Sequence, residues 1–217
     1  MTEFSPLLGA GVGVIFGYGA WAAARRFMGR DAPAEARIPG VALSSGLLPA
    51  LGMAAWGAYV FWRMDALAVK MAIMVSAALL LSILLVDFAA FRIPDLLVGM
   101  LLAWGGVQAA WMGHPPWRSA ALGALIGGGL FWVLAWIGQG GLGMGDVKFM
   151  AAEGALLGFP LILQGMFWGI LFGGVAALIL LATKRAGRKD RMAYGPYLVL
   201  AAWLVYLMTW NLLPWQS

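Results

Sequence analysis

Residues 138–148 read GQGGLGMGDVK and place a glycine-rich turn and one carboxylate, Asp146, between two long apolar runs. A charged side chain beside a membrane-length apolar run is costly, so it points to a functional site. A second carboxylate, Asp87, directly follows the apolar run MAIMVSAALLLSILLV. We therefore expect Asp87 and Asp146 to meet in one site.

The amino-acid composition is that of a membrane protein. Of the 217 residues, 63% are hydrophobic and only 11% are charged, and the mean hydropathy is +0.89. A soluble domain carries about 25% charged residues. Runs of about 20 apolar residues, the length of a helix that crosses a bilayer, follow one another almost from end to end. The sequence predicts an all-α, polytopic membrane protein in which residues 1–217 form a single transmembrane domain.

About eight transmembrane helices are expected. Their approximate bounds are residues 5–24, 46–62, 67–86, 95–112, 119–137, 147–163, 164–182 and 194–213. Glycines recur at four-residue spacing in two of these segments: Gly9, Gly13 and Gly17 in the first, and Gly123 and Gly127 in the fifth. Such spacing lets another helix approach closely, so we expect both glycine faces to lie at helix–helix contacts.

The basic residues divide unevenly between the two sides that these spans define. One side carries Arg25, Arg26, Arg30, Arg37, Arg92, Lys148, Lys184, Arg185, Arg188, Lys189 and Arg191. The other side carries Arg63, Lys70 and Arg118. The side rich in Lys and Arg is cytoplasmic by the positive-inside rule. Both chain termini are then expected on the outer side, and Asp87 and Asp146 at the same cytoplasmic face.

Residue counts exclude several kinds of site. The chain has no cysteine, which excludes a disulfide, a thiol nucleophile and a thiolate metal site. Its single histidine, His114, excludes a zinc site built from several imidazoles. Gly138, Gly140 and Gly143 spell GxGxxG, but no strand precedes them as a dinucleotide site requires. The net charge of +5 lies in the gaps between apolar runs, so no nucleic-acid partner is expected. We expect neither a metal nor a cofactor.

Two adjacent carboxylates are suited to acid–base catalysis. Close carboxylates cannot both ionise easily, so the pair shares a proton near neutral pH. The ionised member can activate a water molecule while the protonated member polarises a carbonyl group. A pair formed by Asp87 and Asp146 could therefore hydrolyse a peptide bond.

Four neighbouring residues are expected to support this site. Gly143 and Gly145 flank Met144 and would let the backbone approach an extended substrate and adopt a positive φ. Lys148 could bias the carboxylates, hold a substrate carbonyl or anchor a helix end at the cytoplasmic face. Glu153 could line the site, tune its charge or make a structural polar contact with another helix.

Three separated segments resemble the type IV prepilin peptidases, membrane aspartic proteases with a GxGD motif. The segments are DFAAFRIPD, GMGDVKFMAAEGALLG and YGPYLVLAAW, in that order, and the resemblance covers residues 73–203. It implies that Asp87 and Asp146 are the catalytic aspartates and that Gly143 and Gly145 are the motif glycines. It also implies a functional motif at Tyr194, Gly195 and Pro196, and a catalytic core of about residues 67–213.

The resemblance further implies an enzyme of the bacterial inner membrane with periplasmic termini. Such an enzyme removes the short basic leader of prepilin-like proteins at the cytoplasmic face and needs no cofactor for cleavage. Many bacterial members also methylate the new N-terminus and carry paired cysteines in a large first cytoplasmic loop. Here that loop, about residues 25–45, is short and has no cysteine, which removes the basis for predicting zinc binding or methyl transfer.

Charges elsewhere suggest how partners are recognised. The basic cluster KRAGRKDR, residues 184–191, could orient the protein, bind anionic lipid head groups or steer a basic leader. A basic leader would be recognised more readily by the acidic residues Asp31, Glu35, Asp95 or Glu153. Charge reversal at those positions with unchanged cleavage would contradict that hypothesis.

Two other functions compete with the peptidase interpretation. Paired intramembrane acids also occur in proton- or ion-coupled transporters, but those are expected to show an internal repeat with broken helices in both halves. No second copy of the GMGD turn is present. The second alternative is an inactive membrane scaffold that assembles through its small-residue faces, and such a scaffold would not need either aspartate.

Overall fold

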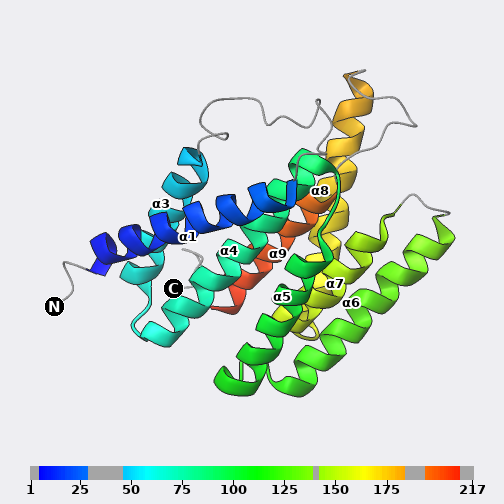
Figure 1. Ribbon diagram of the computed structural model, residues 1–217. Helices are drawn as coiled ribbons and strands as arrows, with labels where there is room; N and C mark the ends of the chain where they lie inside the picture. The colour runs from blue at the N-terminus through cyan, green and yellow to red at the C-terminus, as the bar shows by residue number, and fades with distance from the viewer. Residues whose placement is uncertain (1–4, 29–45, 139–141, 184–193, 211–217) are drawn as a thin grey trace. The chain divides into compact units, whose positions relative to one another are not determined.

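The computed structural model describes residues 5–28, 46–138, 142–183 and 194–210, all of which belong to helices or short connections (Figure 1). The described helices are α1 (Ser5–Met28), α3 (Leu47–Arg63), α4 (Leu67–Ala90), α5 (Asp95–Val107), α6 (Trp117–Ile137), α7 (Met144–Leu157), α8 (Leu161–Ala182) and α9 (Gly195–Thr209). A π-helical turn, η2 (Gln108–Met112), directly follows α5. The all-α prediction is therefore confirmed.

Five of the described helices are long and apolar enough to cross a membrane. They are Ser5–Phe27, Leu67–Ala90, Asp95–Met112, Trp117–Ile137 and Leu161–Ala182. The helices α3, α7 and α9 have 17, 14 and 15 residues. The protein is thus a multi-pass membrane protein, and the expected number of eight spans stays a prediction.

Helix bounds agree closely with the expected spans, with two differences at the carboxylates. The helix α4 continues past Asp87 to Ala90, and α7 already begins at Met144, so both aspartates lie inside helices. The C-terminal end of α7 also differs, since the expected span continues to residue 163. The helix ends at Leu157 because Gly158 adopts a φ of +75°, a conformation that favours glycine.

The chain divides into two compact units, Met1–Ala90 and Phe91–Ser217, and each is described by itself. In the first unit, α1 and α3 lie antiparallel with their backbones in close contact. A Cβ atom at Gly9 would collide with the backbone of Gly57, and one at Gly17 with the backbone near Pro49. Near the start of α1, the Ser5 hydroxyl donates a hydrogen bond to the carbonyl of Phe61 at 2.7 Å. The predicted glycine face of the first span is confirmed.

The helix α7 is the core of the second unit and runs antiparallel to α6 (Figure 1). A Cβ atom at Gly123 of α6 would collide with the carbonyl oxygen of Gly154, and one at Gly127 with that of Met150. On another side of α7, a Cβ atom at Gly105 of α5 would lie 2.9 Å from the backbone of Ala155 and Leu156. The glycine face predicted for the fifth span is therefore also a helix–helix contact.

Hydrogen bonds and ring contacts define the two ends of the second unit. The turn between α7 and α8 is bonded to the start of α6, because Ser119 Oγ donates to the Phe159 carbonyl at 2.7 Å and the Phe159 N–H donates to the Ser119 carbonyl at 3.0 Å. At the end of α9, the ring of Trp210 lies 4.4 Å from that of His114, centroid to centroid. The start of α7, with Asp146, lies near the C-terminal end of α6, opposite the end that Ser119 marks.

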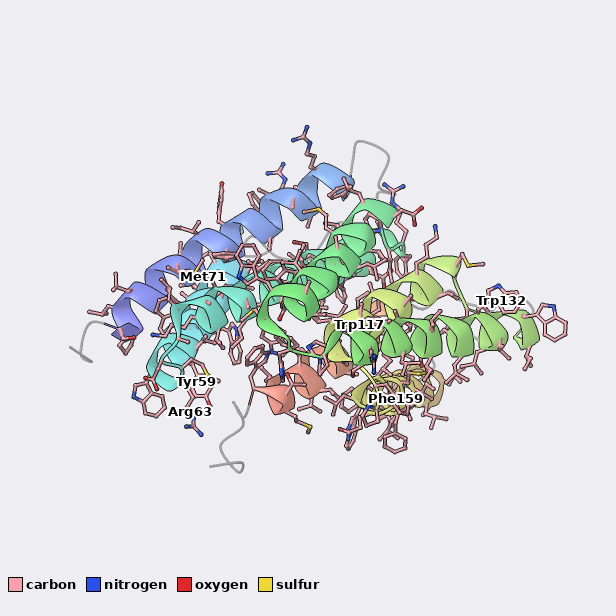
Figure 2. The ribbon with its side chains drawn as sticks, turned by 90° about the horizontal axis from the view of Figure 1, so that it is seen from below. Tyr59, Arg63, Met71, Trp117, Trp132 and Phe159 are labelled. Atoms are coloured by element: carbon pink, nitrogen blue, oxygen red, sulfur yellow. The ribbon has the colours of Figure 1, made fainter. Side chains whose placement is uncertain are left out.

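Tryptophans mark the ends of α6. Trp117 lies at its start and Trp132 in its last two turns, and both side chains are more than half exposed (Figure 2). Exposed tryptophans near helix ends are typical of the membrane–water interface. The positions of these residues fit a helix that crosses the bilayer.

Candidate active site

Asp146 lies in the first turn of α7, where its carboxylate caps the helix. The backbone N–H of Gly143 donates a hydrogen bond to Asp146 Oδ2 at 3.1 Å. The Asp146 N–H in turn donates to the Gly143 carbonyl at 3.1 Å. A carboxylate is also favoured here because the N-terminus of a helix carries partial positive charge. The local sequence therefore fixes the orientation of the Asp146 side chain.

Two opposing influences set the proton affinity of Asp146. Burial raises the pKa of its carboxyl above the usual range, and the hydrogen bond from Gly143 lowers it in part. Burial acts by disfavouring the charged form, and the hydrogen bond acts by stabilising it. The net effect makes Asp146 a better proton acceptor than a fully exposed aspartate.

The motif glycines provide space and do not provide unusual backbone angles. Gly143 has a φ of −74°, and Gly145 lies inside the helix without a positive φ. The expected positive φ is therefore wrong for both. A Cβ atom at Gly143 would lie 3.2 Å from Asp146 Oδ2, and one at Gly145 would lie 3.2 Å from Cβ of Ile93. Glycine at these positions lets the carboxylate fold back and lets the start of α7 pack on the segment before α5.

An ion pair joins the same two segments. Lys148 Nζ lies 2.8 Å from both carboxylate oxygens of Asp95, the first residue of α5. The two side chains are 48% and 72% exposed. Lys148 was expected to bias the carboxylates, hold a substrate carbonyl or anchor a helix end at the cytoplasmic face, and its pairing with Asp95 was not predicted. The sequence does contain an indication of this pair, because the segments RIPD and GMGDVK both begin helices that are expected to start at the cytoplasmic face.

Glu153 lies two turns after Asp146 and is completely buried. Neither of its carboxyl oxygens has a hydrogen-bond partner among the residues that the structure describes. Its carboxyl lies against α8 at Gly165, where a Cβ atom would collide with Glu153 Oε1. The predicted polar contact with another helix is not found in the described part of the chain.

The Tyr194-Gly195-Pro196 motif starts α9 beside α8. The Tyr194 hydroxyl donates a hydrogen bond to the Gly169 carbonyl at 3.4 Å, and a Cβ atom at Gly173 would collide with its ring. The Tyr194 hydroxyl lies close enough to Asp146 for the two groups to interact electrostatically. Gly195 and Pro196 form the buried first turn of α9.

Asp87 belongs to the first unit, where it lies in the last turn of α4 and is only 4% exposed. The helix ends at Ala90, and Phe91 then adopts a φ of 50°. Asp146 belongs to the second unit. The pairing of the two aspartates stays a prediction.

The remaining sequence-based candidates fall into two groups. Asp31, Glu35, the loop of residues 25–45 beyond Met28, and the basic cluster 184–191 lie outside the described residues. His114 lies at the opposite end of the second unit from Asp146, and burial lowers its pKa. Across the described ranges, no group of three or more His, Cys, Asp or Glu side chains could hold a metal ion.

Comparison with known proteins identifies related sequences. Residues 74–178 match the type IV leader peptidase family. A prepilin leader peptidase/N-methyltransferase of Neisseria gonorrhoeae is 29% identical over 187 residues, which cover 82% of this chain and 61% of that protein. Proteins of the same name from Aeromonas salmonicida and Pseudomonas aeruginosa are 32% and 30% identical, over 64% and 79% of this chain and 51% and 58% of theirs. The chain thus spans little more than half the length of these relatives. No solved structure matches it.

Proposed function

Residues 74–178 belong to the type IV leader peptidase family, and from this premise we propose that the protein is a membrane aspartic endopeptidase that cleaves the leader of prepilin-like proteins. Asp87 and Asp146 would be its catalytic pair. The similar proteins are named prepilin leader peptidases, which supports the choice of substrate. Cleavage of this kind needs only water and the two carboxyl groups.

One observation carries the assignment of the site. The start of α7 packs on the segment before α5, through Gly145 against Ile93 and through the ion pair of Lys148 with Asp95. Asp87 precedes Ile93 by only six residues. Six residues of chain reach at most about 20 Å, and less where they are helical. A connection this short allows Asp87 to lie near Asp146, and this supports the proposed pair.

The proposed reaction uses the two carboxyls in complementary states. The ionised carboxylate takes a proton from a water molecule, whose oxygen attacks the scissile carbonyl carbon. The protonated carboxyl donates a hydrogen bond to the carbonyl oxygen and stabilises the charge that develops there. The C–N bond then breaks, and the leaving amine takes up a proton from the pair. The leader is released with a new carboxyl terminus.

Methyl transfer is not part of the proposal, although the similar proteins carry that activity in their names. In the resembling family it goes with paired cysteines, and this chain has no cysteine. The residues present therefore do not fit a cysteine zinc site.

We also propose eight membrane spans in one transmembrane domain, with the active site at the cytoplasmic face of a bacterial inner membrane and both termini in the periplasm. The three short helices each run beside a helix long enough to span. The helix α3 follows α1, and α7 follows α6, while α9 extends from the end with Asp146 to the end with His114. A helix that accompanies a membrane span over its length is expected to cross with it. The positive-inside rule supports the orientation.

The decisive experiment is cleavage of a full-length prepilin-like substrate by the purified protein in liposomes. Wild type is compared with Asp87→Asn and Asp146→Asn, and with Asp65→Asn as a control at an exposed carboxylate. We expect cleavage by wild type and by Asp65→Asn, and none by the other two variants, provided that both remain folded. Cleavage that persists without either catalytic aspartate would reject the assigned pair. A wild-type protein that cleaves no leader but moves protons across the liposome would favour the transporter.

A further inference from the structure

The feature that the proposed chemistry leaves unused is the carboxyl group of Glu153. It is completely buried in α7 and has no hydrogen-bond partner among the described residues. Burying a carboxyl without a partner costs stability and disfavours its ionised form. An apolar side chain of similar volume would fill this place at lower cost. A buried polar group without a partner, which lowers stability, is expected where function requires it.

The position of Glu153 relates it to the catalytic end of α7. Seven residues separate it from Asp146, so two helical turns place both residues on the same face, with Glu153 about 10 Å further along the axis. A substrate whose leader lies in the cytoplasm and whose hydrophobic segment enters the membrane must follow this direction. The part of the substrate after the scissile bond would therefore pass the level of Glu153.

A substrate segment in that place has a specific chemical need. A helix must unwind locally before a protease can cleave it, and unwinding frees backbone N–H and C=O groups. Inside a membrane each such group costs several kcal/mol unless it is bonded to protein. A neutral carboxyl group offers one donor and one acceptor, which matches a peptide unit.

Access to Glu153 requires movement of α8 away from α7. The α8 residue that lies against the carboxyl is a glycine, Gly165, so no side chain at that position covers Glu153 Oε1. The closer partner of α8 is α9, which it contacts at Gly169 and Gly173. Three residues, 158–160, connect α8 to α7, and the first of them has a φ of +75°. A separation of α8 from α7 at Gly165 would open the Glu153 carboxyl to the membrane.

We propose that Glu153 binds the backbone of the hydrophobic substrate segment that follows the scissile bond, once α8 has separated from α7 at Gly165. This inference rests on the proposed peptidase function and extends it to substrate selection inside the membrane. Glu153 is a binding residue in this scheme and takes no part in bond cleavage.

The test measures substrate binding in an Asp146→Asn background, in which no cleavage interferes. Glu153→Leu and Glu153→Gln are added separately, and each protein is titrated with the full-length substrate and with the leader peptide alone. Because a lost buried polar contact typically weakens binding by a factor of about ten, Glu153→Leu is expected to bind the full-length substrate about ten-fold more weakly. Glu153→Gln keeps a donor and an acceptor and is expected to bind within about two-fold of its parent. Neither change should alter binding of the leader alone.

Two results would overturn the inference. One is full-length substrate bound equally well by Glu153→Leu and by its parent. The other is an equal loss for the full-length substrate and for the leader alone, which would indicate a general structural defect. Failure of the peptidase proposal is distinguishable, because it would appear as absent or aspartate-independent cleavage by the protein with Glu153 intact.

Discussion

The carboxylate of Asp146 is held between an influence that neutralises it and one that keeps it charged. Burial favours the neutral form, and the N–H of Gly143, 3.1 Å from Oδ2, favours the charged form. A catalytic pair needs one carboxyl in each state near neutral pH. In the proposed pair with Asp87, the hydrogen bond from Gly143 would therefore adjust the pH range in which the enzyme works.

Replacing Gly143 by proline should shift that range. Proline removes the N–H and suits the φ of −74° at this position. Without the hydrogen bond, the pKa of Asp146 rises further, so the limb of the pH profile that Asp146 controls moves to higher pH. The measurement is kcat/KM for leader cleavage as a function of pH. Gly143→Ala keeps the N–H and serves as the control. Coincident profiles for the two variants would mean that this hydrogen bond does not set the pKa.

Glu153 makes the protein less stable than an apolar residue would. Because neither oxygen is bonded in the described part of the chain, Glu153→Leu is expected to raise the free energy of unfolding by about 1–3 kcal/mol. Glu153→Gln leaves polar atoms in the same place and should give no such gain. Thermal unfolding in detergent micelles compares the two. A destabilised Glu153→Leu protein would show that the carboxyl has a partner after all.

At the scale of helices, the second unit depends on backbone contact between α6 and α7. A Cβ atom at Gly123 would collide with the Gly154 carbonyl, whereas one at Gly129 of the same helix has nothing within 4 Å. Gly123→Ala is therefore expected to lower the free energy of unfolding by about 1–3 kcal/mol, and Gly129→Ala to leave it unchanged or slightly higher. Unfolding curves recorded under the same conditions decide the matter. Equal stability of the two variants would mean that the helices separate without cost.

The ion pair between α5 and α7 has a different balance of effects. With side chains 48% and 72% exposed, it should add less than about 1 kcal/mol to stability. Its loss in Lys148→Met should nevertheless lower kcat for leader cleavage several-fold, because Asp146 lies only two residues away on the same helix end. The charge-swapped double variant, Asp95→Lys with Lys148→Asp, should recover part of the loss. A double variant no better than Lys148→Met would show that Lys148 acts through some other group.

The helices were predictable from the sequence, and the contacts between them were predictable only in part. Apolar runs locate membrane helices because every backbone group in a bilayer must be bonded internally. The glycine faces at Gly9 and Gly123 were found because small residues at four-residue spacing have a geometric meaning. The Lys148–Asp95 pair was missed because 53 residues separate its members and no local pattern links them. The burial of Glu153 could not be predicted either, since it depends on where α8 packs.

At the scale of the whole molecule, the number of membrane crossings determines which residues share a face. The helix α7 has 14 residues and is about 21 Å long, less than the roughly 30 Å of a bilayer core. By length alone, α7 would not be counted as a membrane-spanning helix. Its antiparallel contact with α6, closed by the hydrogen bonds between Ser119 and Phe159, argues that it crosses. The connection between α7 and α8 should then lie on the side opposite Asp146.

Because the chain has no cysteine, single introduced cysteines can test this topology. Three exposed positions are suitable for labelling: Met144 at the start of α7, Trp117 at the start of α6 and Phe159 after α7. The last two are labelled in Figure 2. In sealed vesicles of known orientation, a membrane-impermeant thiol reagent should label Met144→Cys only from the cytoplasmic side. It should label Trp117→Cys and Phe159→Cys only from the outer side. Labelling of Phe159→Cys from the cytoplasm would make α7 a re-entrant helix. Asp87 and Asp146 would still share the cytoplasmic face, since both precede the connection between α7 and α8. The helices α8 and α9 would cross the membrane in the opposite directions. Tyr194 would then lie at the outer face, on the other side of the membrane from Asp146.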